Sequence, residues 1–119
     1  MEILLVGAGG VGAAFAAIAA RRDFFDHIVI ADFDEVRAQK VAAIDDRYSA
    51  AQIDASDAGS VEALVREHAI THVMNAVDPR FVMPTFTGAY AGGADYLDMA
   101  MSLSRPHAES PYSLTGLKL

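Results

Sequence analysis

Three spaced glycines directly after a short apolar run constrain this chain more than any other feature. The run Ile3–Val6 leads into Gly7-x-Gly9-x-x-Gly12 and then into an alanine-rich segment. Position 7 permits a tight turn out of a strand, position 9 lets bare backbone approach a pyrophosphate, and position 12 lets the next helix pack closely. The first N–H groups of that helix are unpaired and carry the positive end of its dipole, which favours an anion. The residues predicted to bind a pyrophosphate are Gly7, Gly9, Gly10, Val11 and Gly12.

The surrounding sequence favours a dinucleotide site over a glycine-rich turn that binds nothing. A helix is predicted over residues 11–22, and a second strand, His27–Ala31, ends beside Asp32, twenty positions after Gly12. An acidic side chain at that spacing accepts hydrogen bonds from the adenosine ribose hydroxyls. The alternative role for Asp32 is that of a turn or cap residue at a strand end.

Asp32 also bears on which nicotinamide cofactor is bound. Its carboxylate repels a 2′-phosphate but accepts from a 2′-hydroxyl, so NAD is predicted over NADP. Arg37 is the nearest cation, one helical turn further on, and is interpreted as a solvated helix residue. Phe33 covers one face of adenine or belongs to the core, and the sequence leaves both open.

Composition narrows the class of protein. The 119 residues are 53% hydrophobic, which suits one globular domain, and the lack of cysteine excludes disulfides and thiolate metal sites. A net charge of −7 argues against a nucleic-acid or anionic-membrane surface.

The apolar stretch Ala13–Ala20 is too short to span a membrane, and Met1-Glu2 is not a basic signal start, so a cytoplasmic protein is expected. His68 and His72 flank a helix-to-strand turn and need not share a face, so no metal site is predicted.

Strand and helix patterns alternate along the first hundred residues. Strands are predicted over 2–6, 27–31, 50–54, 71–76 and 95–99, and helices over 11–22, 34–46, 57–69 and 81–91. Consecutive βα units connected by right-handed crossovers predict an α/β fold, a doubly wound parallel sheet of Rossmann type in the order 3-2-1-4-5 with helices on both faces. Residues 1–100 are expected to form this domain, and the proline-containing residues 101–119 to form an extended tail leading to an absent substrate or catalytic domain.

Two further strand ends contribute candidate residues. Asp54 and Ala55 follow the third predicted strand, where Asp54 accepts a hydrogen bond from the adenine amine or caps the next helix. Asn75, Ala76 and Val77 end the fourth, where small residues let backbone pass close to the pyrophosphate and the nicotinamide ribose, unless they form a plain turn. These five residues complete the predicted cofactor site. No residue of the chain is assigned a catalytic role.

Five segments together resemble the N-terminal NAD(P)-binding domain of saccharopine dehydrogenases: Ile3–Gly12, Ile30–Asp32, Gln52–Ser56, Val73–Val77 and Gly93–Asp98. The resemblance implies that this domain binds a nicotinamide cofactor while a separate C-terminal part holds an amino-acid or keto-acid substrate. It further implies reversible hydride transfer at the C–N bond of an imine or secondary amine. Many members have an arginine after the second strand, and Asp32-Phe33 departs from that pattern, in favour of NAD.

A rival function comes from a different class of protein. Nucleotide-sensing regulatory modules of potassium-transport systems use the same strand–glycine–helix unit with an acid after the second strand, and they act without catalysis. Such a module is expected to dimerise through its helices. The sequence leaves the oligomeric state open, a homodimer included.

Overall fold

The computed structural model describes residues 1–99, and the predicted tail 101–119 lies outside the described residues. Strands and helices alternate in it as the sequence predicts. The strands are β1 Glu2–Val6, β2 His27–Asp32, β3 Tyr48–Gln52, β4 His72–Asn75 and β5 Asp95–Asp98. The helices are α1 Gly10–Ala19, α2 Glu35–Ala42, α3 Ala58–Glu67 and α4 Val82–Gly92, with a 3₁₀ turn, η1 Pro79–Phe81, before α4. Within residues 1–99, no helix has the length and apolar character that crossing a membrane requires.

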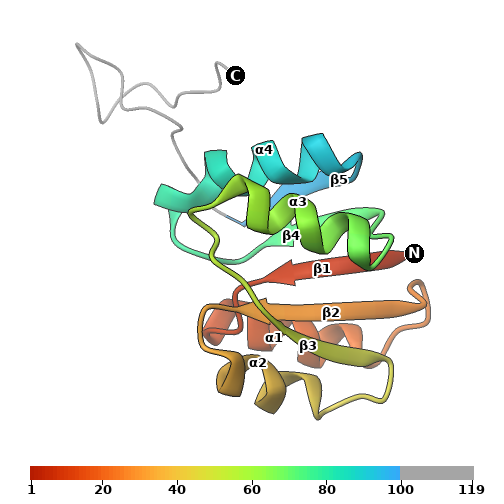
Figure 1. The fold of residues 1–119 in the computed structure, drawn as a ribbon. Coiled ribbons are helices and arrows are strands. Elements are labelled where there is room, and N and C mark those ends of the chain that lie inside the picture. Colours follow the sequence, from red (N-terminus) through yellow and green to blue (C-terminus); the bar gives the residue numbers. More distant parts are fainter. Residues whose placement is uncertain (100–119) are drawn as a thin grey trace, which may run out of the picture.

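All five strands are parallel and form one sheet in the order β3-β2-β1-β4-β5, which confirms the predicted topology (Figure 1). The central strand β1 pairs with β2 on one side and with β4 on the other, so Leu4 lies opposite both Val29 and Val73. The strand order therefore changes direction at β1, with β2 and β3 on one side of it and β4 and β5 on the other. Ligands of such sheets bind in the crevice beyond the strand ends at this point.

Alternate residues of β1 are buried on opposite faces of the sheet. Ile3 and Leu5 point toward α1 and α2, whereas Leu4 and Val6 point toward α3 and α4 (Figure 1). Leu4, Leu5 and Val6 have no exposed surface. Burial on both faces explains why β1 is a continuous apolar run rather than an alternation of apolar and polar residues.

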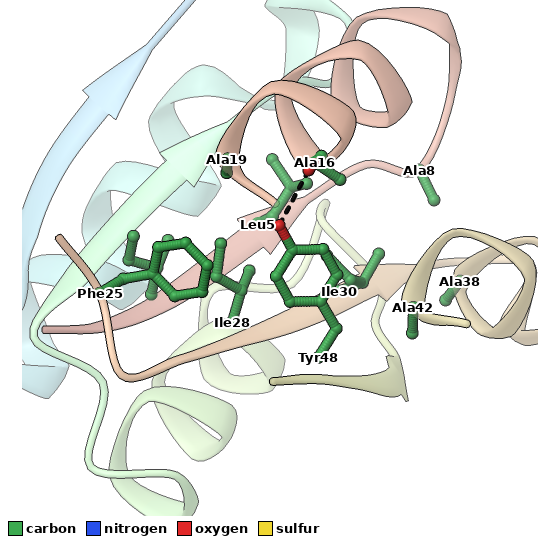
Figure 2. Packing of buried hydrophobic residues seen from close by; sticks show 11 residues of the cluster. Leu5, Ala8, Ala16, Ala19, Phe25, Ile28, Ile30, Ala38, Ala42 and Tyr48 are labelled. Atoms are coloured by element: carbon green, nitrogen blue, oxygen red, sulfur yellow. Dashed lines mark hydrogen bonds between the residues drawn. The ribbon is translucent and has the colours of Figure 1, made fainter. Parts of the chain in front are cut away.

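Small residues let α1 and α2 approach the sheet closely. Ala16 and Ala19 of α1 and Ala42 of α2 face the strands in the cluster of Figure 2. The Tyr48 hydroxyl of β3 donates a hydrogen bond to the Ala16 carbonyl at 2.8 Å, and its ring lies 5.8 Å from that of Phe25. This bond ties the edge strand to α1 and helps to fix the position of that helix over the carboxyl end of β1.

The ends of some elements differ from the sequence prediction. β3 covers 48–52 rather than 50–54, because Tyr48 already pairs with Ile28 in the parallel register. α2 ends at Ala42 rather than near residue 46, where Arg47 folds back to donate two hydrogen bonds to the Asp45 carboxylate. α3 ends before Ala69, whose φ of +49° is incompatible with a continuing helix.

Candidate functional site

Three loops meet at the carboxyl edge of the sheet, where β1, β2 and β4 end. The N–H of Gly7 donates to the carbonyl of Ala31 at 2.7 Å, and the N–H of Ala76 donates to the carbonyl of Val6 at 2.8 Å. Backbone bonds therefore place the glycine loop between the turn after β2 and the turn after β4. The structure brings the predicted residues of all three turns together at one edge.

Gly7 and Gly12 are required by the fold itself. Gly7 has a φ of +102°, and a Cβ there would lie 2.7 Å from Cγ1 of Val77. A Cβ on Gly12 would lie 1.8 Å from the carbonyl oxygen of Gly7, closer than any real contact. The predicted tight turn and close helix packing at these two positions agree with this geometry.

Gly9 is different, because nothing in the described structure requires a glycine there. Its φ of −73° and ψ of −166° suit any residue, and a Cβ at this position would meet no atom within 4 Å. The same open space surrounds a Cβ added to Gly10. The space that a side chain at position 9 or 10 would fill is therefore open.

The N-terminus of α1 is suited to an anion. Gly9 is its N-cap and provides no side chain to accept from the first N–H groups, and the first turn of α1 contains no acidic residue. The next two helices, by contrast, are capped by their own carboxylates: Asp34 accepts from the N–H groups of Val36 and Arg37, and Asp57 from that of Gly59. The first-turn donors of α1 are left for an acceptor from outside, as a pyrophosphate would provide.

Asp32 is held rigidly beside the glycine loop. Only 8% of the residue is exposed, and its Oδ2 accepts from the N–H of Ala8 at 2.7 Å while Oδ1 accepts from the N–H of Asp34 at 2.9 Å. The carboxylate thus fixes the turn after β2 as well as the loop after β1. Since each carboxylate oxygen accepts more than one hydrogen bond, capacity for a ribose hydroxyl remains. Asp34, not Asp32, caps α2.

Arg37 lies nearer to this carboxylate than the sequence indicated. Its Nη1 is 3.6 Å from Oδ1 of Asp32, and its Nη2 is 3.9 Å from Oδ2 of Asp34. The side chain is 54% exposed, so it is solvated as predicted, but it stands at the edge of the site. The i, i+3 spacing of Asp34 and Arg37 is the one sequence signal of this proximity.

The sequence left two roles open for Phe33 and two for Asp54, and the structure excludes one role of each residue. Phe33 is 74% exposed, so it does not belong to the core. Asp54 does not cap α3, because that role belongs to Asp57; Asp54 accepts instead from the N–H and the hydroxyl of Ser56, at 2.9 and 2.6 Å. The Ser56 hydroxyl lowers the pKa of Asp54. Asp54 and Ala55 lie just past β3, near the site because the N–H of Ile53 donates to the carbonyl of Asp32.

Asn75 is buried and serves the turn after β4. Its exposed fraction is 1%, its Nδ2 donates to the Tyr96 hydroxyl at 2.9 Å, and its Oδ1 accepts from the N–H of Val77 at 3.1 Å. Its side chain is directed into the protein, which leaves Ala76 and Val77 as the residues of this turn that border the glycine loop. In residues 1–99, no cluster of three or more potential metal ligands occurs.

The chain matches the family described as the saccharopine dehydrogenase NADP binding domain over residues 3–116. It belongs to this family. Membership favours the dehydrogenase interpretation over the regulatory module and agrees with the resemblance found in the sequence. No curated protein matched the chain.

Solved structures confirm the fold. Saccharopine dehydrogenase (L-Glu forming) from Saccharomyces cerevisiae superimposes with a TM-score of 0.72 at 19% identity, over 88% of this chain and 22% of the yeast chain. A putative epimerase from Bacteroides thetaiotaomicron gives 0.68 at 20% identity, over 82% of this chain and 45% of that one. Quinate dehydrogenase from Corynebacterium glutamicum, solved with NAD, gives 0.52 at 23% identity, over 81% and 43%. The chain thus spans about a fifth of the yeast enzyme's length.

Proposed function

We propose that this chain is the cofactor-binding part of a nicotinamide-dependent oxidoreductase of the saccharopine dehydrogenase kind. The observation that carries the proposal is the pairing of an uncapped α1 N-terminus, open over Gly9, with the buried carboxylate of Asp32 beside it. One feature suits linked phosphates and the other suits the ribose hydroxyls of adenosine. Family membership adds independent support.

The work of this domain is binding and positioning. The N–H groups of the first turn of α1 hold the pyrophosphate, Asp32 orients the adenosine ribose, and the backbone of Ala76 and Val77 guides the nicotinamide half along the end of β4. The cofactor, when bound, supplies the hydride exchanged with the carbon of an imine or secondary amine derived from an amino acid. We place the substrate site and the proton-transfer groups in a further domain beyond the tail 101–119, so the chain alone is expected to be inactive.

We further propose that NAD is preferred to NADP. The 2′-position of a ribose bound to Asp32 lies against a carboxylate, with a second carboxylate, that of Asp34, close by. Two negative charges disfavour a 2′-phosphate, while a 2′-hydroxyl donates to Asp32. The family description names NADP, whereas this chain's own residues after β2, Asp32 and Asp34, favour NAD.

Isothermal titration of the chain with NADH and NADPH tests the proposal. NADH is expected to bind with a Kd below about 1 mM at modest salt, and NADPH more weakly. ADP-ribose, which contains the adenosine and pyrophosphate portions, should retain most of the NADH affinity, whereas nicotinamide mononucleotide should retain little. If neither dinucleotide binds at millimolar concentration, the proposed function is wrong. If NADPH binds with a lower Kd than NADH, the preference for NAD is wrong but the proposed function stands.

A further inference from the structure

Two neighbouring residues at the start of β3 donate side-chain hydrogen bonds to the backbone of α1 and of the turn that follows it. The Tyr48 hydroxyl donates to the Ala16 carbonyl at 2.8 Å (Figure 2). Arg47 donates from Nη2 to the carbonyl of Ala20 at 3.1 Å and from Nη1 to that of Arg22 at 2.7 Å. The side chains of Arg47 and Tyr48 thus form a clamp, the β3 clamp, on the C-terminal half of α1.

The guanidinium of Arg47 is itself held in place. Its Nε and Nη2 donate to the Asp45 carboxylate at 2.9 and 2.8 Å, and its Cζ lies 4.2 Å from the centroid of the Phe25 ring. The side-chain hydrogen bond from Arg47 lowers the pKa of Asp45 to about 2, so the carboxylate is charged at neutral pH. A cation bound to the last carbonyls of a helix also opposes the negative end of the helix dipole. Arg47 therefore caps α1 from a distant part of the chain.

The packing of α1 on the sheet is apolar and lacks direction. The helix contains no charged residue, and its buried residues are Gly12, Ala16 and Ala19. Contacts between small apolar groups are non-directional, whereas hydrogen bonds have a preferred geometry. Within the described part of the chain, the hydrogen bonds that side chains donate to positions 10–22 all come from the β3 clamp. The clamp therefore fixes the rotation and tilt of α1.

The orientation of α1 matters because its first turn is the proposed pyrophosphate site. The close contact between Gly12 and the carbonyl oxygen of Gly7 sets how near the start of the helix lies to the end of β1. Rotation or tilt about that contact would still move the first-turn N–H groups relative to Asp32. The helix has ten residues and is only about 15 Å long, so a constraint on its second half also orients its first turn.

We propose that Arg47 and Tyr48 are positioning residues for the cofactor: by holding the C-terminal half of α1 they align its first-turn N–H groups with the pyrophosphate. This inference rests on the proposed function, because it concerns the same N–H groups. Groups that bind a ligand must be held to within about 0.5 Å by the residues that support them. The β3 clamp supplies that support from outside the site.

The alternative role for the β3 clamp is to stabilise the fold and nothing more. That role predicts a lower free energy of unfolding but an unchanged ligand affinity in any variant that remains folded. Misalignment of α1 predicts weaker binding of a ligand that contains a pyrophosphate, even when the variant is fully folded. The affinity of folded variants therefore separates the two roles.

The test is calorimetric titration of the Tyr48→Phe, Arg47→Met and Arg47→Lys variants with ADP-ribose, after urea denaturation has shown that each is folded under the conditions of the titration. Tyr48→Phe keeps the ring and removes one hydrogen bond, so it is the variant most certain to fold. Tyr48→Phe and Arg47→Met are each expected to raise the Kd for ADP-ribose about fivefold or more. Arg47→Lys should restore part of the affinity, because it keeps a charged donor near the same carbonyls.

Arg66→Met is the matched control. Arg66 donates from Nη2 to the carbonyl of Ala91, near the end of α4, and from Nε to the Glu62 carboxylate, both at 2.8 Å. It thus binds α4 much as Arg47 binds α1, but α4 contains none of the residues predicted to bind the cofactor. Arg66→Met should lower the free energy of unfolding and leave the Kd for ADP-ribose unchanged.

The outcomes distinguish this inference from the function on which it rests. If the unaltered chain binds neither NADH nor ADP-ribose, the proposed function fails and the inference fails with it. If the unaltered chain binds ADP-ribose and folded Tyr48→Phe binds it equally well, the positioning role is wrong and the proposed function stands. A loss of affinity in Arg66→Met as large as that in Arg47→Met also overturns the role, because a general loosening of the fold would then explain the effect.

Discussion

Gly9 and Gly12 belong to one motif, yet their hydrogen atoms face different surroundings. The space beside Gly9 is empty of protein, whereas the space beside Gly12 is filled by the backbone of Gly7. Stability therefore constrains Gly12, whereas folding places no such constraint on Gly9. If the proposed pyrophosphate site is right, the motif combines a folding requirement with a binding requirement, and substitution separates them.

Substitution of Gly9 by valine is expected to abolish cofactor binding without unfolding the chain. The new side chain enters the open space over the first turn of α1, while the free energy of unfolding falls by only about 1 kcal/mol, the usual cost of losing a favourable N-cap. Gly12→Ala, by comparison, should cost about 3 kcal/mol, because its Cβ overlaps a carbonyl oxygen. NADH titration and urea denaturation measure the two effects. Unchanged NADH affinity in Gly9→Val would refute the proposed pyrophosphate site.

For single residues, the sequence predicted well where each one lies along the chain but predicted poorly how its side chain is oriented. Asp32 follows the glycine motif by a fixed distance along the chain, so local pattern alone places it at the end of β2. The orientation of Asn75 depends on Tyr96, twenty-one residues later, and the position of the Arg37 guanidinium depends on its side-chain rotamer. Contacts of those two kinds leave no periodic signal in a single sequence.

At the scale of elements, a hydrogen-bonded link joins β4, β5 and α4. The Tyr96 hydroxyl of β5 accepts from Asn75 of β4 and donates to the carbonyl of Val82 in α4 at 3.4 Å. Burial raises the pKa of Tyr96 from 10.0 to about 12; the Asn75 hydrogen bond lowers it in part, and the Asp98 carboxylate raises it. The neutral phenol is thus the form that the folded protein favours.

This link predicts a loss of stability at alkaline pH. The folded-state pKa lies above the unfolded value, so between about pH 10 and pH 12 the unfolded chain loses the Tyr96 proton first and becomes relatively more stable. The contribution of Tyr96 to the free energy of unfolding should be constant below pH 10 and should fall as the pH rises from 10 toward 12. Tyr96→Phe should reduce that fall. Part of it should remain, because burial also raises the pKa of Tyr48.

Urea denaturation at a series of pH values measures this effect, with Tyr90→Phe as the control. Tyr90 lies on α4 and is 77% exposed, so its substitution should leave the profile unchanged. An identical alkaline slope in Tyr96→Phe and in the unaltered protein would show that the buried phenol is not its source.

Elements were predicted more accurately in their order than in their ends. Apolar runs and capping residues identify each strand and helix, and the right-handed crossover rule then leaves few topologies. The start of β3 was missed by two residues, because Tyr48 and Ser49 join the sheet through their register with β2. The end of α2 was missed because Arg47, just beyond it, binds the Asp45 carboxylate and also the carbonyls of Ala20 and Arg22, in a distant part of the chain.

At the scale of the whole molecule, the described residues cover the two faces of the sheet unequally. On the face that carries α1 and α2, the strands β4 and β5 are not overlaid by a helix within residues 1–99 (Figure 1). Leu97 of β5 lies on this face and is 60% exposed. A hollow of about 360 Å³ lies between α1 and β5, bordered by Phe15, Phe24 and Met74.

An apolar surface of this kind is expected to bind a hydrophobic dye such as anilinonaphthalene sulfonate while the chain remains folded. Leu97→Glu places a negative charge at the edge of the hollow, which repels the sulfonate of the dye, and should lower the dye fluorescence, with little change in stability because the side chain is already largely exposed. Ile44→Glu is the matched control, since Ile44 is 51% exposed in the turn after α2 and does not border the hollow. Weak dye binding by the unaltered chain, equal to that of Leu97→Glu, would contradict an exposed apolar surface at this hollow. Strong binding that Leu97→Glu lowers and Ile44→Glu does not would locate the dye at the hollow, as an exposed apolar surface there requires.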